Sequence, residues 1–210
     1  MNIFFCGGGT SGHIIPAVAI AEKFEEKDPD SKITFIVRRG GKENDVLKKR
    51  NKAIREIDIM GLKRKITLEN FERIKKAFSA VKECQKIIDE LRPDCIIGTG
   101  GYVCWPMLIA GKRRRIPTFL HESNIYPGLV TKLLSAKCDK VFLSNAETKK
   151  FLPRHTNYSV VGNPLIKEYS QTSRKSARAK LMLKPQEKLI VSFGGNIGAE
   201  KLNDVIINVM

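Results

Sequence analysis

Long apolar runs, closely spaced cysteine pairs and acidic residues are the scarce features of this 210-residue sequence. Its longest uncharged apolar stretches, residues 14–21 and 102–111, fall well short of the roughly 20 residues that a membrane-spanning helix needs. The five cysteines are an odd number and none has CxxC spacing, which predicts reduced thiols serving as small hydrophobic residues. Met1 leads directly into a strand-like segment without a basic region or cleavage site, so we expect no secretion signal.

The shortage of acidic residues leaves a large positive charge, with 38 Lys and Arg against 22 Asp and Glu, or +16. Such a charge indicates an acidic partner, and nucleic acid, anionic lipid and phosphorylated substrates all qualify. A lysine-rich surface with no partner is the alternative. Aromatic residues make up only 7% of the chain and do not interleave with basic ones, so we expect no nucleic acid.

Basic residues cluster at 112–115, 63–65 and 48–50. Leu62 precedes the second cluster, and Ile66 and Leu68 follow it. Apolar side chains beside cations are typical of a surface that touches anionic lipid, although a solvated charged face has the same composition. The pattern predicts reversible attachment to an anionic membrane surface.

Short apolar segments alternate with helical patterns along most of the chain. Strands are predicted over residues 2–6, 32–37, 55–59, 94–97, 118–121, 140–144 and 158–161. Helices are predicted over 14–24, 42–51, 69–91 and 106–110, and the third carries apolar residues at spacings of three, four or seven. This alternation predicts an α/β fold, a Rossmann-like open parallel sheet with helices on both faces.

The composition changes after residue 163. Residues 164–187 hold Pro164, Pro185 and a mixture of Ser, Thr, Lys and Arg, which predicts an interdomain linker with one short helix near 176–182. Residues 188–193 read as a strand, 194–198 as a glycine turn, and a helix follows from 199. We therefore predict a first domain at 1–163, a linker at 164–187, and at 188–210 the first strand, loop and helix of a truncated second α/β domain.

Glycine-rich turns follow three of the predicted strands, at residues 7–12, 98–101 and 194–198. Glycines allow the backbone to approach a phosphate, and the helix that follows supplies free N–H groups. The first turn formally matches GxGxxG, yet the second strand ends in Arg38 and Arg39 where a NAD site has a carboxylate. Phosphate or diphosphate binding is the prediction, and NADP remains a weaker alternative.

Five segments also carry a family resemblance: GGGTSGHIIPAVAIA, IIGTGGYVCWP, IPTFLHESNIYPGLVTKLLS, VVGNPL and SFGGNIGAEKLN. In this order and at these separations the chain resembles, from residue 1 to 210, the MurG family of bacterial glycosyltransferases. The resemblance implies inverting transfer of N-acetylglucosamine from UDP-GlcNAc to lipid I, giving lipid II for peptidoglycan. It also implies a glycosyltransferase-B fold, two Rossmann-like domains facing a cleft, at the cytoplasmic face of the bacterial membrane as a peripheral protein.

The resemblance also implies site residues. Those placed at the donor UDP-GlcNAc are Thr10, Ser11, Gly12, Asn124, Ile166 and Asn196. Those placed at the acceptor diphosphate are Gly100, Gly101 and Tyr102. The chain departs from the family pattern where Ser11 replaces a glycine, where Cys104 and Trp105 replace Ser-Gly, and where Ile166 replaces a frequent basic residue.

Sugar transfer needs a general base, and His13 and Glu122 are the candidates. His13 follows the first glycine turn at a helix start, where the helix dipole favours a neutral, proton-accepting imidazole. Glu122 follows a buried strand next to His121. Either could instead order its own loop, whereas His155 is expected at the surface.

No metal or other cofactor is expected. Asp28 and Asp30 spell an Asp-x-Asp pair, but they fall between the first helix and the second strand, at the edge away from the glycine turns, where a tight turn is the expectation. A truncated, inactive module that binds acceptor and membrane, and that needs a missing donor domain, is the alternative function.

Overall fold

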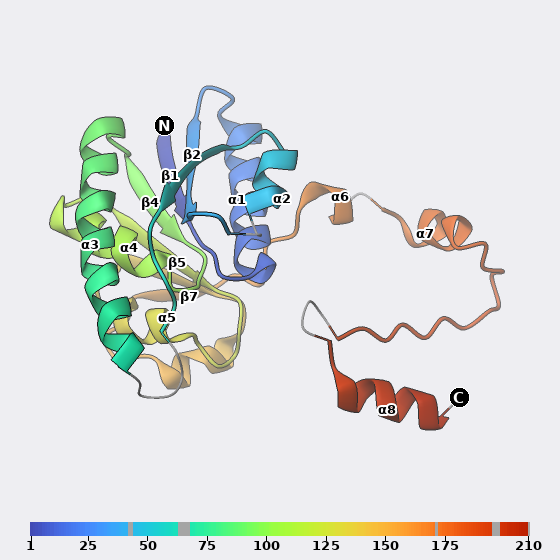
Figure 1. The fold of residues 1–210 in the computed structure, drawn as a ribbon. Coiled ribbons are helices and arrows are strands. Elements are labelled where there is room, and N and C mark those ends of the chain that lie inside the picture. The colour runs from blue at the N-terminus through green and yellow to red at the C-terminus, as the bar shows by residue number, and fades with distance from the viewer. Residues whose placement is uncertain (42–43, 63–67, 171, 195–197, 210) are drawn as a thin grey trace. The chain divides into compact units, whose positions relative to one another are not determined.

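The structure is a computed structural model that describes residues 1–41, 44–62, 68–170, 172–194 and 198–209. It divides into two compact units, Met1–Ser170 and Gln171–Met210. The first unit holds a seven-stranded sheet with its helices (Figure 1).

All strand pairs of the sheet are parallel, in the order β3-β2-β1-β4-β5-β6-β7. The strands are β1 (Asn2–Cys6), β2 (Lys32–Arg38), β3 (Ala53–Ile57), β4 (Cys95–Gly98), β5 (Thr118–Glu122), β6 (Lys140–Leu143) and β7 (Tyr158–Val160). The predicted Rossmann-like fold is therefore confirmed. The strand order reverses between β1 and β4, and this switch point is where open parallel sheets bind ligands.

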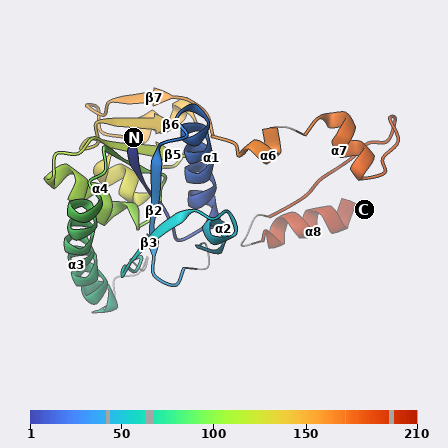
Figure 2. The same cartoon turned by 90° about the horizontal axis from the view of Figure 1, so that it is seen from above.

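Helices cover both faces of this sheet (Figures 1 and 2). Alternation along the strands explains why: Ile3 and Phe5 of β1 join one apolar cluster, while Phe4 and Cys6 join the other. The first cluster is covered by α1 (Ser11–Lys27) and α2 (Asn44–Lys49). The second is covered by α3 (Leu68–Leu91), α4 (Cys104–Arg113) and α5 (Leu129–Leu134).

The cysteines behave as predicted, because all five are buried and free. Four of them, Cys6, Cys84, Cys104 and Cys138, belong to the cluster under α3 and α4. Burial raises the pKa of the Cys138 thiol to about 11, which keeps it protonated at neutral pH. No helix among the described residues is both long and apolar enough to cross a lipid bilayer.

Several predicted boundaries shift, and three elements were not predicted. Helix α1 begins at Ser11, three residues before the predicted start at 14, so Pro16 falls in its second turn. Strand β3 runs from Ala53 to Ile57 rather than over 55–59, which frees residues 58–62 to leave the sheet. The unpredicted elements are α5, the 3₁₀ helix η1 (Ala146–Phe151) and α6 (Lys167–Ser170).

The first unit continues past the predicted domain boundary at 163. Ile166 is only 1% exposed and packs into the cluster under α1. Lys167 extends this attachment, since its backbone N–H donates to Glu22 Oε2 and its ammonium group pairs with Glu26. Apolar burial and ion pairing thus bind the start of the predicted linker to α1.

The second unit contains α7 (Arg174–Lys180) and α8 (Glu200–Val209). The side chain of Ser173 caps α7 by accepting a hydrogen bond from Ser176 N. The strand predicted over 188–193 is wrong, because residues 188–194 form no regular element in the described chain. A strand exists only through hydrogen bonds to a neighbouring strand, and the described part of this unit offers none.

Candidate active site

The first two glycine turns meet at the carboxyl edge of the sheet, beside the switch point between β1 and β4. Thr99 joins them: its backbone N–H donates to Cys6 O, and its hydroxyl donates to His13 O at 2.7 Å. A Cβ at Gly7 would lie 2.6 Å from Thr99 Oγ1, so a larger residue there would separate the turns. Thr99 was not predicted as a site residue, although it lies inside the segment IIGTGGYVCWP.

Gly100 and Gly101 bring the second turn against the first. Their φ angles are +106° and +82°, a region that favours glycine. A Cβ on Gly101 would lie 1.9 Å from Gly8 O, and one on Gly100 would lie 2.6 Å from His13 Cδ2. These glycines are therefore required by close packing around His13, whatever ligand the turn holds.

Tyr102 packs between two further glycines. A Cβ on Gly9 would lie 2.9 Å from Tyr102 Cε1, and one on Gly61 would lie 2.8 Å from Tyr102 Cδ1. The tyrosine ring thereby connects the first glycine turn to residues 58–62, which follow β3. This contact explains how a segment outside the sheet reaches the site.

His13 lies in the first turn of α1, half-buried, with its ring at the junction of the two turns. Its Nδ1 is 3.0 Å from Gly8 O and 3.2 Å from Thr10 Oγ1. A carbonyl oxygen can only accept, so Nδ1 of the neutral ring carries the proton and Nε2 keeps its lone pair. This arrangement leaves Nε2 able to accept a proton from a ligand.

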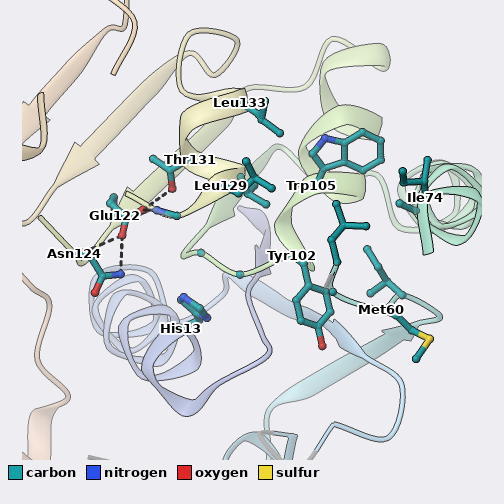
Figure 3. Close-up of a pocket in the computed structure, with 18 of the residues that line it drawn as sticks. His13, Met60, Ile74, Tyr102, Trp105, Glu122, Asn124, Leu129, Thr131 and Leu133 are labelled. Atoms are coloured by element: carbon teal, nitrogen blue, oxygen red, sulfur yellow. Dashed lines mark hydrogen bonds between the residues drawn. The ribbon is translucent and has the colours of Figure 1, made fainter. Parts of the chain in front are cut away.

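Glu122, at the end of β5, is 4% exposed and its carboxylate is fully engaged. Oε1 accepts hydrogen bonds from the backbone N and Nδ2 of Asn124, at 2.9 and 3.0 Å. Oε2 accepts from Gly128 N at 3.0 Å and Thr131 Oγ1 at 2.6 Å (Figure 3). These contacts favour the loop-ordering role over that of a base, because a proton on this carboxylate would displace at least one of these donors.

The neighbouring His121 points away from this site. It is 2% exposed, and its Nε2 donates to Gly162 O at 3.2 Å. Its Nδ1 is buried without a hydrogen-bond partner, and burial lowers the pKa of the imidazole. His155 is exposed, as expected.

The residues that the resemblance placed at the donor are only partly gathered together. The hydroxyl of Thr10 contacts the His13 ring. Helix α1 begins with Ser11 and Gly12. Asn124 is exposed and lines the same pocket as His13. The placement of Ile166 at the donor is corrected by the structure, because its side chain is buried under α1 and is closed to a ligand. Asn196 lies outside the described residues.

A pocket of about 420 Å³ opens beside the glycine turns (Figure 3). We call one side the polar end, which comprises His13, Gly100, Gly101, Glu122 and Asn124. We call the other side the apolar end, which comprises Met60, Ile74, Phe78, Trp105, Leu129 and Leu133. The apolar end was not predicted as a site, although Leu129, Val130 and Leu133 form a short apolar pattern after Gly128.

Comparison with known proteins identifies the family. Residues 3–143 match the model of the glycosyltransferase family 28 N-terminal domain. The chain belongs to glycosyltransferase family 28. The resemblance that the sequence motifs indicated is thereby confirmed.

Curated relatives of this family-28 chain carry one shared name, UDP-N-acetylglucosamine–N-acetylmuramyl-(pentapeptide) pyrophosphoryl-undecaprenol N-acetylglucosamine transferase. The Acetivibrio thermocellus protein is 39% identical over 206 residues, covering 98% of this chain and 56% of the relative. The Caldanaerobacter subterraneus protein is 37% identical over 210 residues, covering all of this chain and 58% of the relative. The chain thus spans a little over half the length of these relatives.

One solved structure agrees with the family-28 assignment, and a second shares the fold. The crystal structure of Acinetobacter baumannii MurG has a TM-score of 0.72 and 26% identity, covering 97% of this chain and 55% of that one. A UDP-GlcNAc 2-epimerase from Neisseria meningitidis has a TM-score of 0.65 at 16% identity, covering 100% of this chain and 62% of that one. The second likeness shows a shared fold alone.

The Asp-x-Asp pair of this family-28 chain lies where the sequence predicted. Asp28 caps the carboxyl end of α1 and pairs with the amino group of Met1 at 3.1 Å, away from the glycine turns. Within the described residues, no group of three or more His, Cys, Asp or Glu side chains could hold a metal ion.

The described basic clusters are separate and partly neutralised. Residues 112–115 lie at the end of α4 opposite the site, where Lys112 pairs with Asp139 and Arg114 with Asp89. Residues 48–50 lie on the α1 face, where Arg50 pairs with Glu22 and Glu168. Residues 63–65 lie outside the described chain. The described clusters therefore do not form one continuous basic surface.

Proposed function

We propose that this chain is the acceptor-binding half of an inverting N-acetylglucosaminyltransferase. The acceptor is undecaprenyl-diphospho-MurNAc-pentapeptide (lipid I) and the donor is UDP-GlcNAc, as the names of the curated relatives indicate. The observation that carries the proposal is His13, which lies at the junction of two glycine turns, lines the pocket, and keeps Nε2 as an acceptor because Nδ1 donates to Gly8 O.

In this mechanism the acceptor hydroxyl gives its proton to His13 Nε2 while its oxygen attacks the anomeric carbon of the donor. Attack comes from the face opposite the diphosphate, so the new glycosidic bond forms as the bond to UDP breaks. Thr10, Ser11, Gly12, Asn124 and Asn196 are proposed to contact the donor. The N-terminus of α1 stabilises the charge on the departing diphosphate, so we expect turnover to persist in the presence of EDTA.

The acceptor diphosphate is assigned to the second glycine turn. Gly100, Gly101 and Tyr102 form the turn before α4 and line the pocket beside His13, and a glycine-rich turn allows its backbone to approach a phosphate closely. Glu122 is proposed to act indirectly, because its four hydrogen bonds fix Asn124 and the loop that leads into α5.

Membrane attachment is proposed at α3. Phe71, Ile74 and Phe78 are 61%, 43% and 56% exposed, and the ammonium group of Lys75 lies 4.5 Å from the ring centroid of Phe71. Large apolar side chains beside a cation suit the surface of an anionic membrane. We therefore propose that the protein attaches peripherally to the cytoplasmic face of the membrane.

A chimera tests the transferase. The part of the Acetivibrio thermocellus relative that follows the matched region is fused after residue 210, and transfer of labelled N-acetylglucosamine to lipid I is measured. Turnover by the chimera is the expected result, and a properly folded but inactive chimera contradicts the proposal. Activity of the chimera with none for the 210-residue chain alone would identify the latter as an inactive acceptor module.

A further inference from the structure

The apolar end of the pocket exposes large side chains from separate elements. Met60 follows β3, Ile74 and Phe78 come from α3, Trp105 comes from α4, and Leu129 and Leu133 come from α5. Phe78 is 56% exposed and Leu129 is 60% exposed. Covering such surface with an apolar ligand is favourable, because it removes apolar area from water. The convergence of these elements on one hollow suggests that a ligand occupies it.

The two ends of the pocket differ in chemistry (Figure 3). Polar side chains gather at the His13 end, where Glu122 is already saturated by Asn124, Gly128 and Thr131. A sugar or peptide in the apolar end would lose hydrogen bonds to water without gaining partners from its side chains, which is costly. A hydrocarbon chain makes no hydrogen bonds to water, so it would lose none on entering the apolar end.

We propose that the apolar end binds the first isoprene units of a polyprenyl diphosphate. The pocket is continuous from Gly100 and Gly101 to Trp105, so a diphosphate on the second glycine turn would direct its prenyl chain into this end. The identity of the acceptor rests on the proposed function. The new element is that the protein itself holds the first part of the prenyl chain, in addition to the bilayer.

Trp105 provides a direct probe, because it is the only tryptophan in the sequence and it lines the apolar end. Its ring already packs edge-to-face on Phe78, with centroids 5.6 Å apart. Farnesyl diphosphate is titrated into the 210-residue chain in detergent-free buffer, below the concentration at which it aggregates, and tryptophan emission is recorded. Inorganic diphosphate is titrated in parallel. We expect a saturable blue shift with farnesyl diphosphate and affinity at least about tenfold above that of inorganic diphosphate.

A filling variant separates the pocket from general surface hydrophobicity. Ala77 is a small, half-buried lining residue of α3, so Ala77→Phe should fill the pocket without reducing the apolar surface. Ser79→Phe is the matched control, because Ser79 is exposed on the same helix and does not line the pocket. Only Ala77→Phe should weaken farnesyl diphosphate binding, by about tenfold, with inorganic diphosphate unaffected.

A second variant covers the case in which Ala77→Phe fails to fold. Ile74 is 43% exposed, so Ile74→Thr should fold normally and weaken prenyl binding alone. Equal affinities for farnesyl and inorganic diphosphate, or equal effects of the Ala77 and Ser79 variants, would overturn the inference. If the chimera transfers sugar, that result would leave the proposed transferase function intact. Prenyl binding by a chimera that transfers no sugar would instead support this inference and contradict the transferase function.

Discussion

His13 Nδ1 lies 3.0 Å from the carbonyl oxygen of Gly8, and this single contact decides which ring nitrogen can act as a base. The carbonyl requires a donor, so the proton is held on the nitrogen that faces the first glycine turn. The opposite side of the ring packs on Gly100, where a Cβ would come within 3.1 Å of Nε2. Both glycine turns therefore set the orientation and the tautomer of one imidazole.

Replacing His13 by glutamine should remove the base while keeping a polar side chain. We expect kcat of the chimera to fall by about 10²- to 10⁴-fold, the usual contribution of a positioned general base. Turnover is measured with labelled UDP-GlcNAc over a range of pH. His155→Gln is the control, because His155 is exposed, and it should retain full activity. Unchanged turnover of the His13 variant would exclude His13 as the base.

Glu122→Gln should act first on stability. An amide presents one acceptor and one donor group, so its NH₂ would face a donor from Asn124, Gly128 or Thr131. Each buried group left unsatisfied costs about 1–3 kcal/mol, which chemical denaturation can measure. The exposed Glu147→Gln should change little. Wild-type stability combined with lost turnover would instead support Glu122 as the base.

Gly101 and Gly12 should differ sharply when each is changed to alanine. A Cβ at Gly101 meets Gly8 O at 1.9 Å, and its φ of +82° disfavours alanine by about 1–3 kcal/mol even without the clash. A Cβ at Gly12 meets only Thr10 Oγ1 at 3.5 Å, an ordinary contact, and alanine favours the helix that begins there. Thermal unfolding should show a large loss for Gly101→Ala and none for Gly12→Ala. Equal losses would refute the packing argument.

His121 should make the first unit sensitive to acid. Burial lowers the pKa of its imidazole below the usual value of about 6.5, so the unfolded state binds a proton more readily than the native state. This contribution to stability is full above that value and is lost as pH falls through it toward the lower native pKa. Urea midpoints measured at a series of pH values should therefore decline in this range for the wild type. His121→Gln should show a shallower decline, and an identical profile for both proteins would contradict this assignment.

Local patterns were sufficient to predict most of the fold. The alternation of Phe4 and Cys6 with Ile3 and Phe5 reports a strand buried on both faces, and a glycine turn followed by a helix reports a βα junction. Such signals depend on backbone geometry over a few residues. The prediction failed at residues 188–193, where an apolar run resembles a strand but strand formation depends on a partner that no local pattern contains.

The candidate site also has parts that the sequence predicts and parts that it does not. The glycine turns and His13 could be identified because tight turns favour glycine and a general base needs a side chain such as histidine. The burial of Ile166 could not be predicted, since it depends on how the chain packs against α1 after β7. Nor could the pocket be predicted, because its apolar end combines residues from α3, α4, α5 and the segment after β3.

The sequence by itself therefore determined the parallel α/β architecture, the glycine turns and the candidate bases, because each is encoded by neighbouring residues. Only the tertiary structure separated the two bases. The Gly8 carbonyl and the packing of Gly100 hold the His13 ring with Nδ1 as the donor and Nε2 as the acceptor, whereas the loop after β5 folds back to saturate the Glu122 carboxylate with donors. Hydrogen-bond satisfaction depends on which groups the fold brings together, and it decides what each side chain can still do.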